Sequence, residues 1–219
     1  METMVSREEK GMEHAVVGGS ASEALGGGAG AILAILGLSH VAPPYMLAIA
    51  SIVLGGALLF DGALIAADYS HVLERSGSKG LSAAELGGGL SAEALTGAAA
   101  IVLGILALLG LERDILMPAS AIVLGAGLVL SSGVSSRLNE VKIDTTEENL
   151  VARRVAHEAV SASSGAQTLV GISAIVLGIL SLIGFAPVIL PLVAMLAIGI
   201  AILLSGTAIS GRMLATFGG

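Results

Sequence analysis

Three apolar segments of similar sequence recur along this chain, and their recurrence limits the folds available to it. The pentapeptide Ala-Ile-Val-Leu-Gly at residues 100–104 returns at 174–178, and a looser copy lies at 30–34. Each copy belongs to a pair of apolar stretches divided by a short turn. A unit that recurs at a nearly fixed interval is one supersecondary element repeated. The sequence therefore predicts an internal triplication of three tandem helical hairpins.

The apolar stretches have the length of membrane-spanning helices. The first runs for about 20 residues to Ser39, which is what a helix needs to cross roughly 30 Å of hydrocarbon. Proline or charged residues interrupt the apolar pattern at 42–44, 112–114 and 185–187, where we predict tight turns. We predict six transmembrane helices, near residues 20–39, 45–67, 91–111, 115–133, 164–184 and 188–209.

The composition agrees with a membrane location. Hydrophobic residues make up 55% of the 219 residues, charged residues only 12%, and the mean hydropathy is +0.95. Because soluble domains carry about a quarter charged residues, we exclude a soluble domain and predict an all-α integral membrane protein. Aromatic residues are only 2%, so Tyr45, Tyr69 and Phe185 are the candidate aromatic anchors at the membrane interface.

Several kinds of chemistry have no support in the sequence. Without Cys there is no disulfide or thiolate ligand, and the four His lack the spacing that places two metal ligands on one helix face. No nucleophile elbow or phosphate loop is present, and a net charge of −7 argues against nucleic acid as a partner. We therefore expect no enzyme activity, no metal and no cofactor.

Two polar connections divide the repeats. The connection at 68–90 contains a flexible Ser-Gly-Ser-Lys-Gly run, and the one at 134–163 contains an amphipathic stretch at 149–160. That stretch is either a helix at the membrane surface or a solvated connector helix. The predicted division is an N-terminal segment at 1–19, hairpin repeat 1 at 20–67, a connector at 68–90, hairpin repeat 2 at 91–133, a connector with the amphipathic helix at 134–163, and hairpin repeat 3 with the C-terminal residues at 164–219.

Basic residues predict the orientation. They gather near the termini and the long connections: Arg7, Lys10, Arg75, Lys79, Arg137, Lys142, Arg153, Arg154 and Arg212. Only Arg113 lies among the short turns, so the positive-inside rule places both termini and both connectors in the cytoplasm. His71, Arg137 and Arg212 follow the second helices of the repeats and are predicted to anchor them at the membrane interface. The sequence resembles prokaryotic membrane proteins, which implies the inner or plasma membrane.

Small residues recur at equivalent places in all three repeats. Equivalent positions are 70 and 74 residues apart, as in Gly27, Gly97 and Gly171. The predicted helix-packing residues are Gly27, Gly97, Gly171, Gly55, Gly125, Gly199, Gly30, Ala34, Ala100, Gly104, Ala174 and Gly178. Small residues four apart form a groove for another helix. The groove is either a seam between copies in a dimer or ring, or packing between the two helices of one hairpin, which a tight hairpin favours.

One carboxylate lies well inside an apolar span. Asp61 has Ser131 and Ser205 at the equivalent positions of the other repeats, and an ionisable group in hydrocarbon is a candidate functional site. These three residues are therefore a candidate proton or cation site. The alternative is that Asp61 lies near the cytoplasmic face in water, or bonds to hydroxyls of neighbouring helices, and the polar continuation of its helix favours this alternative.

Two families have a comparable plan. Three tandem two-helix repeats are similar to the mitochondrial carriers, but the Pro-x-Asp/Glu-x-x-Lys/Arg signature of that family is absent. Small-residue hairpins with a carboxylate on the second helix resemble the proteolipid rotor subunits of ATP synthases. The chain departs from that family because only Asp61 of three equivalent positions is acidic, because it lies late in its helix, and because the predicted orientation is inverted. We infer membership of neither family.

The function predicted from these features is structural. We expect a non-catalytic membrane protein that scaffolds or anchors, either by self-association as a homo-oligomer or by holding a partner complex in the lipid bilayer. The alternative is a pore, transporter or rotor-like protein that moves an ion by means of Asp61.

Overall fold

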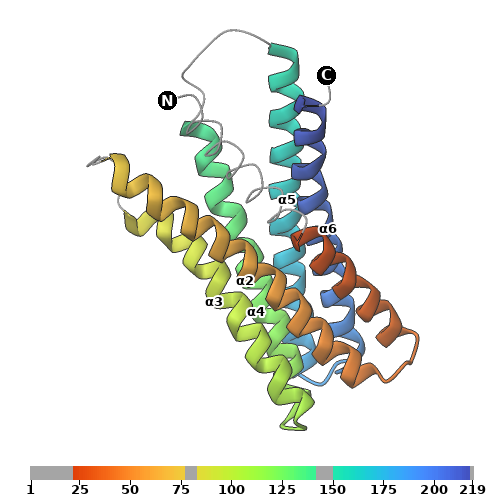
Figure 1. The fold of residues 1–219 in the computed structure, drawn as a ribbon. Helices are drawn as coiled ribbons and strands as arrows, with labels where there is room; N and C mark the ends of the chain where they lie inside the picture. Colours follow the sequence, from red (N-terminus) through yellow and green to blue (C-terminus); the bar gives the residue numbers. More distant parts are fainter. Residues whose placement is uncertain (1–21, 77–82, 142–149, 218–219) are drawn as a thin grey trace.

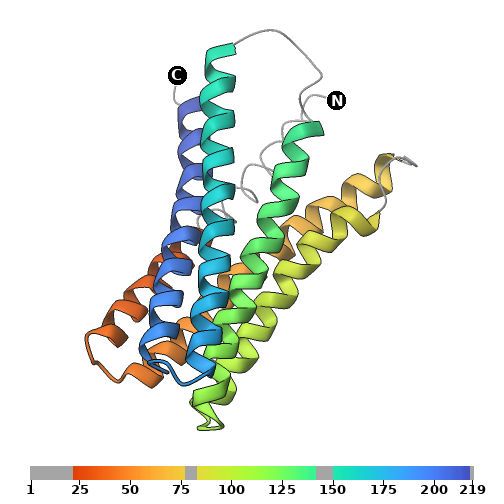
Figure 2. The same ribbon diagram turned by 180° about the vertical axis from the view of Figure 1, so that it is seen from behind.

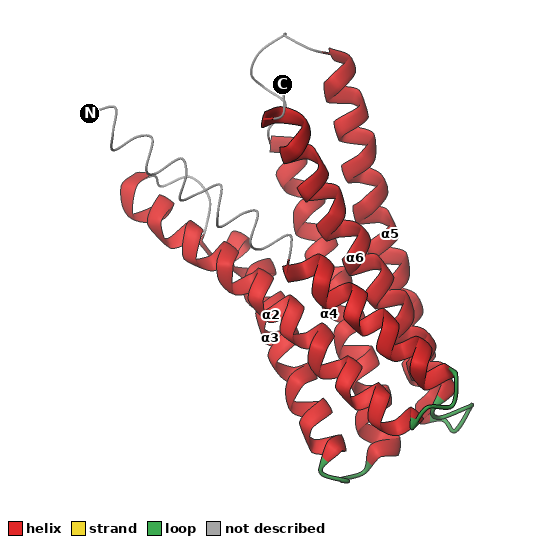
Figure 3. Ribbon diagram, turned by 45° about the vertical axis from the view of Figure 1, so that its right-hand side comes forward, coloured by secondary structure: helices red, strands yellow, loops and turns green. Residues whose placement is uncertain are grey.

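The structure is a computed structural model that describes residues 22–76, 83–141 and 150–217, and the side chains of 22–60, 93–132 and 165–207. These residues form helices and turns, with no strand among them (Figure 3). The helices are Ser22–Leu38, α2 (Pro43–Ser76), α3 (Ala83–Leu108), α4 (Arg113–Val141), α5 (Leu150–Leu182) and α6 (Ile189–Phe217). The predicted all-α class is confirmed for this part of the chain.

Four of the helices are long and apolar enough to cross a membrane. These windows are Pro43–Phe60, Arg113–Ser132, Gly165–Leu182 and Ile189–Thr207. The apolar parts of the other two helices, Ser22–Leu38 and Glu93–Leu108, are shorter within the described residues. Helices of this length and composition are consistent with a membrane protein.

The three short turns have the same backbone conformation. A residue with positive φ ends the preceding helix, at His40 (65°), Gly110 (88°) and Gly184 (99°). Its N–H bonds to the carbonyl three residues earlier, and the next N–H bonds to the carbonyl five residues earlier, at 3.0–3.2 Å in every case. This is the Schellman motif, in which a left-handed residue closes a helix. The chain thus adopts the same turn geometry between the two helices of each apolar pair.

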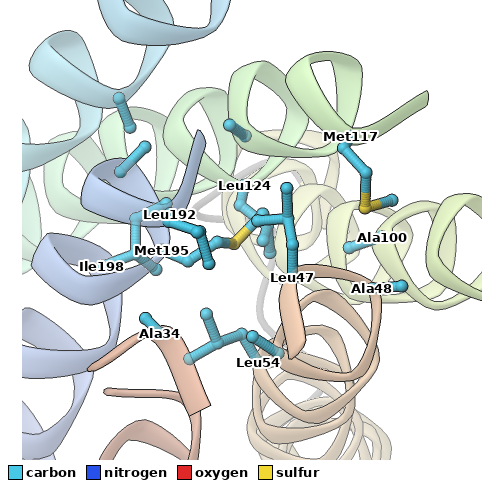
Figure 4. Close-up of a cluster of buried hydrophobic side chains, with 14 of the residues drawn as sticks. Ala34, Leu47, Ala48, Leu54, Ala100, Met117, Leu124, Leu192, Met195 and Ile198 are labelled. Carbon is cyan, nitrogen blue, oxygen red and sulfur yellow. The ribbon is translucent and has the colours of Figure 1, made fainter. Parts of the chain in front are cut away.

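Helices α2, α4 and α6 form the inner layer of the bundle. They contact one another, and their burial follows one pattern. Residues 47–60 of α2 and 117–130 of α4 have the same degree of burial at every position, and 191–204 of α6 differ only at Val193 and Ile200. The core they share includes the equivalent residues Leu54, Leu124 and Ile198, all fully buried (Figure 4).

The Ser22–Leu38 helix, α3 and α5 pack on this inner layer. Helix α3 lies along α2, and α5 lies along α4 (Figures 1 and 2). The Ser22–Leu38 helix lies against α6, since Gly27 approaches Gly199 and Leu203. The first helix therefore packs on the last, and the bundle is closed.

Candidate functional site

The six equivalent glycines meet in pairs, and each pair joins one apolar pair of helices to the next. A Cβ added to Gly55 would lie 2.6 Å from the carbonyl oxygen of Gly97, and one on Gly125 would lie 2.6 Å from that of Gly171. One on Gly199 would lie 2.8 Å from that of Gly27. These contacts are within the chain, but between successive predicted hairpins. We expected these glycines to pack either between copies of the chain or between the two helices of one hairpin. The contacts observed follow neither expectation, because they join one hairpin to the next. We call them the glycine seams.

The remaining small residues extend the seams toward the turns. A Cβ on Gly104 would lie 2.8 Å from the carbonyl oxygen of Ala48, and one on Gly178 would lie 2.9 Å from that of Pro118. The other members, Ala34, Ala100 and Ala174, are fully buried. Gly30 differs, because a Cβ there would collide with the side chain of Leu54 on the helix that follows it. Backbone oxygen and isoleucine side-chain atoms of the neighbouring helix both lie within contact distance of a Cβ on Gly104 or Gly178, so the helices approach at van der Waals distance.

Contacts between the two helices of one predicted hairpin use other small residues. A Cβ on Gly26 would lie 2.5 Å from the Cβ of Ala57. At the equivalent positions of the next repeat the sizes are exchanged, because Gly127 of α4 receives the side chain of Thr96 of α3. A larger residue on one helix is therefore matched by a smaller one on its neighbour, as close packing requires.

A layer of polar side chains lies at the end of the bundle away from the short turns. Ser132 of α4 is buried and its hydroxyl lies 2.7 Å from that of Thr168 of α5. Ser131 donates to the carbonyl oxygen of Leu128 at 3.2 Å, and Ser205 lies half-buried on α6. Ser131 and Ser205 thus occupy this layer on different helices. The side chain of Asp61 lies outside the described residues.

The layer also contains a buried carboxyl group that the sequence interpretation did not single out. Glu23 is only 6% exposed, the only charged residue among the buried side chains described. It lies one turn before Gly27, beside the seam with α6. The equivalent residues of the other repeats are Glu93 and Gln167, both half-buried. Ser20-x-x-Glu23 also has the spacing of a capping box, but Ser20 lies outside the described residues.

Apolar side chains fill the bundle between this layer and the turns. Met195, Ile198 and Leu192 of α6 gather with Leu47 of α2 and Leu124 of α4 (Figure 4), and all five are at most 2% exposed. The buried hydroxyls of this region are bonded: Ser51 donates to the carbonyl oxygen of Ala100 at 2.9 Å, across the α2–α3 seam. Among the described side chains, this region carries no charged group that could line an ion path.

Arg113, at the turn end, is folded back onto the protein. Its Nε donates to the carbonyl oxygen of Ala107 at 2.8 Å, and its guanidinium carbon lies 4.7 Å from the centre of the Tyr45 ring. A guanidinium over an aromatic face is a cation–π contact. It joins the second turn to the first residues of α2.

The remaining predictions from the sequence concern the membrane anchors and the possible metal ligands. The side chains of His71, Arg137 and Arg212 lie outside the described residues, as does that of Tyr69. Within the described part, no three His, Cys, Asp or Glu side chains gather as metal ligands. Comparisons with family models, curated proteins and solved structures give no match.

Proposed function

We propose that the chain is a multi-pass membrane protein of three tandem hairpins, arranged with approximate threefold symmetry. The glycine seams, the shared turn geometry and the repeated burial pattern of α2, α4 and α6 support this arrangement. The exposed faces of the outer helices carry large apolar residues at equivalent places, such as Ile32, Val102 and Val176. Side chains of this kind suit contact with lipid tails. With the orientation predicted from the basic residues, both termini and both connectors lie in the cytoplasm of a prokaryotic cell.

Its proposed role is a non-catalytic anchor that holds a partner complex at the cytoplasmic end. The observation that carries this proposal is the filled apolar interior, because a bundle packed with Leu, Ile and Met offers no open path. The glycine seams are occupied within the chain, so we do not propose self-association through them. The polar connectors remain as the surface for a partner.

Native mass spectrometry of the protein, extracted gently from its own membrane, tests this role. We expect one copy of the chain with a stoichiometric soluble protein. Reversing charges on the predicted cytoplasmic side, with Arg153→Glu and Arg154→Glu, should release that protein. The matched control, Asp114→Arg on the exposed turn side, should retain it. A chain that is recovered alone, or only as a homo-oligomer, would contradict the anchor proposal.

A second candidate function is ion translocation, and the burial of Glu23 favours it. A carboxyl group in the apolar part of a membrane protein is costly and often functional. Glu23 shares the polar layer with Ser131 and Ser205, and Asp61 has the equivalent position on α2. This layer would supply the binding site for a proton or cation, and translocation would further require the packed apolar interior to open.

Flux measurements in proteoliposomes test the second candidate. Glu23→Gln and Asp61→Asn should each abolish a proton or cation flux driven by an imposed potential. Gln is already present at the equivalent position 167, so the Glu23→Gln variant should fold. Glu93→Gln, at the half-buried equivalent position, is the matched control and should retain flux. No flux in the wild type, or normal flux in both variants, would rule this candidate out.

A further inference from the structure

The turn end of the bundle is unusually apolar for a surface in water. The turns at 39–42 and 183–187 carry no Asp, Glu, Lys or Arg, and the charges at 112–114 are the only ones among the three turns. Equivalent residues that follow the left-handed position are Val41, Leu111 and Phe185, all at least half exposed, with Phe185 at 71%. Ile115 and Ile189, at the starts of α4 and α6, are also exposed.

Polar groups at this end bond to the turns themselves. The Schellman hydrogen bonds satisfy N–H groups at each turn. Ser39 donates to the carbonyl oxygen of Ile35 at 2.9 Å, and Ser181 donates to that of Pro187 at 3.0 Å. Arg113 bonds to Ala107 and lies over Tyr45. Internal bonding of this kind is needed where water is scarce, because an unsatisfied backbone group in lipid costs several kcal/mol.

The apolar parts of α2, α4 and α6 begin directly at the turns. Their membrane-spanning windows start at Pro43, Arg113 and Ile189, which are the first residues of these helices. Where an apolar span starts at a turn, the turn lies at the edge of the hydrocarbon layer.

We infer that the turn end is a lipid-binding face seated at the boundary between headgroups and acyl chains. Val41, Leu111 and Phe185 lie on the acyl side of this boundary. The charges of Glu112 and Asp114, both exposed, reach the headgroups, while the Arg113 guanidinium is held by Ala107 and Tyr45. The inference rests on the proposed membrane location, and it adds that this end presents lipid contacts in place of a water-exposed surface.

Spin labels on single cysteines test the inference. The chain has no Cys, so Val41→Cys, Leu111→Cys and Phe185→Cys each give one label at an exposed position. The labelled proteins are placed in phosphatidylcholine vesicles with some phosphatidylglycerol, and collisions with oxygen and with a water-soluble nickel chelate are compared. We expect oxygen collisions to exceed nickel collisions at all three positions. Asp114→Cys should show the reverse.

A fourth variant separates this inference from the proposed membrane location. Val102→Cys places a label on the exposed face of α3, midway along its apolar part. If this label reports lipid while the three turn labels report water, the inference of a lipid-binding face at the turn end is wrong and the membrane location stands. If the Val102 label also reports water, both proposals are overturned.

Discussion

His40 occupies a backbone conformation that suits glycine. Its φ is 65°, and the equivalent residues of the other two turns are Gly110 and Gly184. In the left-handed region a Cβ atom crowds the following carbonyl oxygen, which costs roughly 1–2 kcal/mol. At this position the first turn therefore carries strain that Gly110 and Gly184 avoid in the other two turns.

Replacing His40 by Gly should stabilise the protein. We expect His40→Gly to raise the free energy of unfolding by about 1 kcal/mol, because it removes this strain while keeping the Schellman hydrogen bonds. The measurement is thermal or SDS unfolding in detergent micelles, followed by circular dichroism. Gly110→Ala is the matched control and should destabilise the protein by a similar amount. No difference in sign between the two variants would mean that the turn does not hold this conformation.

The sequence predicted the close-packed glycines but not the buried carboxyl group of Glu23. Equivalent glycines could be found by their spacing of 70 and 74 residues, since a repeated close approach leaves a repeated Gly. Glu23 was missed, because Ser20-x-x-Glu23 also fits a capping box and burial of the carboxyl group depends on a neighbouring helix. Asp61, Ser131 and Ser205 remain a prediction, with Ser131 bonded to its own helix.

At the scale of helices, a groove of small residues does not specify its partner. Periodicity shows which side of α3 or α5 is small, but α2 and α4 present similar small faces to either neighbour. The structure joins α3 to α2 and α5 to α4 through the glycine seams. Local sequence could therefore predict the packing face, while the pairing depends on the arrangement of all six helices.

Two glycines on inner helices should respond to alanine in opposite ways. A Cβ on Gly125 would lie 2.6 Å from the backbone oxygen of Gly171, whereas one on Gly56 would meet nothing within 4 Å. Gly125→Ala forces α4 and α5 apart and should destabilise the protein by about 1–3 kcal/mol. Gly56→Ala should stabilise it by up to about 1 kcal/mol, because Ala is the better helix former.

SDS unfolding of both variants in the same micelles measures these changes. The pair is matched because each substitution adds one methyl group inside a helix and only its surroundings differ. Equal effects on stability would mean that the α4–α5 seam is not closely packed.

For the whole molecule, composition and spacing predicted the all-helical class, which is confirmed for the described residues, together with four apolar helices of membrane-spanning length. They could not predict closure of the bundle. Closure requires the Ser22–Leu38 helix to reach α6, a contact between the two ends of the fold that no local pattern encodes. The membrane location, the orientation and the partner remain proposals, because they concern molecules outside the chain.

Contact between the first and last of the described helices makes the point at which the chain starts irrelevant to the packing of the three pairs. Each pair offers one edge to its predecessor and the other to its successor, and the edge of α6 is taken by the Ser22–Leu38 helix. A circular permutant that begins with α3 and ends with α2 would keep every seam. The packing thus sets the cyclic order of the three pairs and leaves the position of the chain break free.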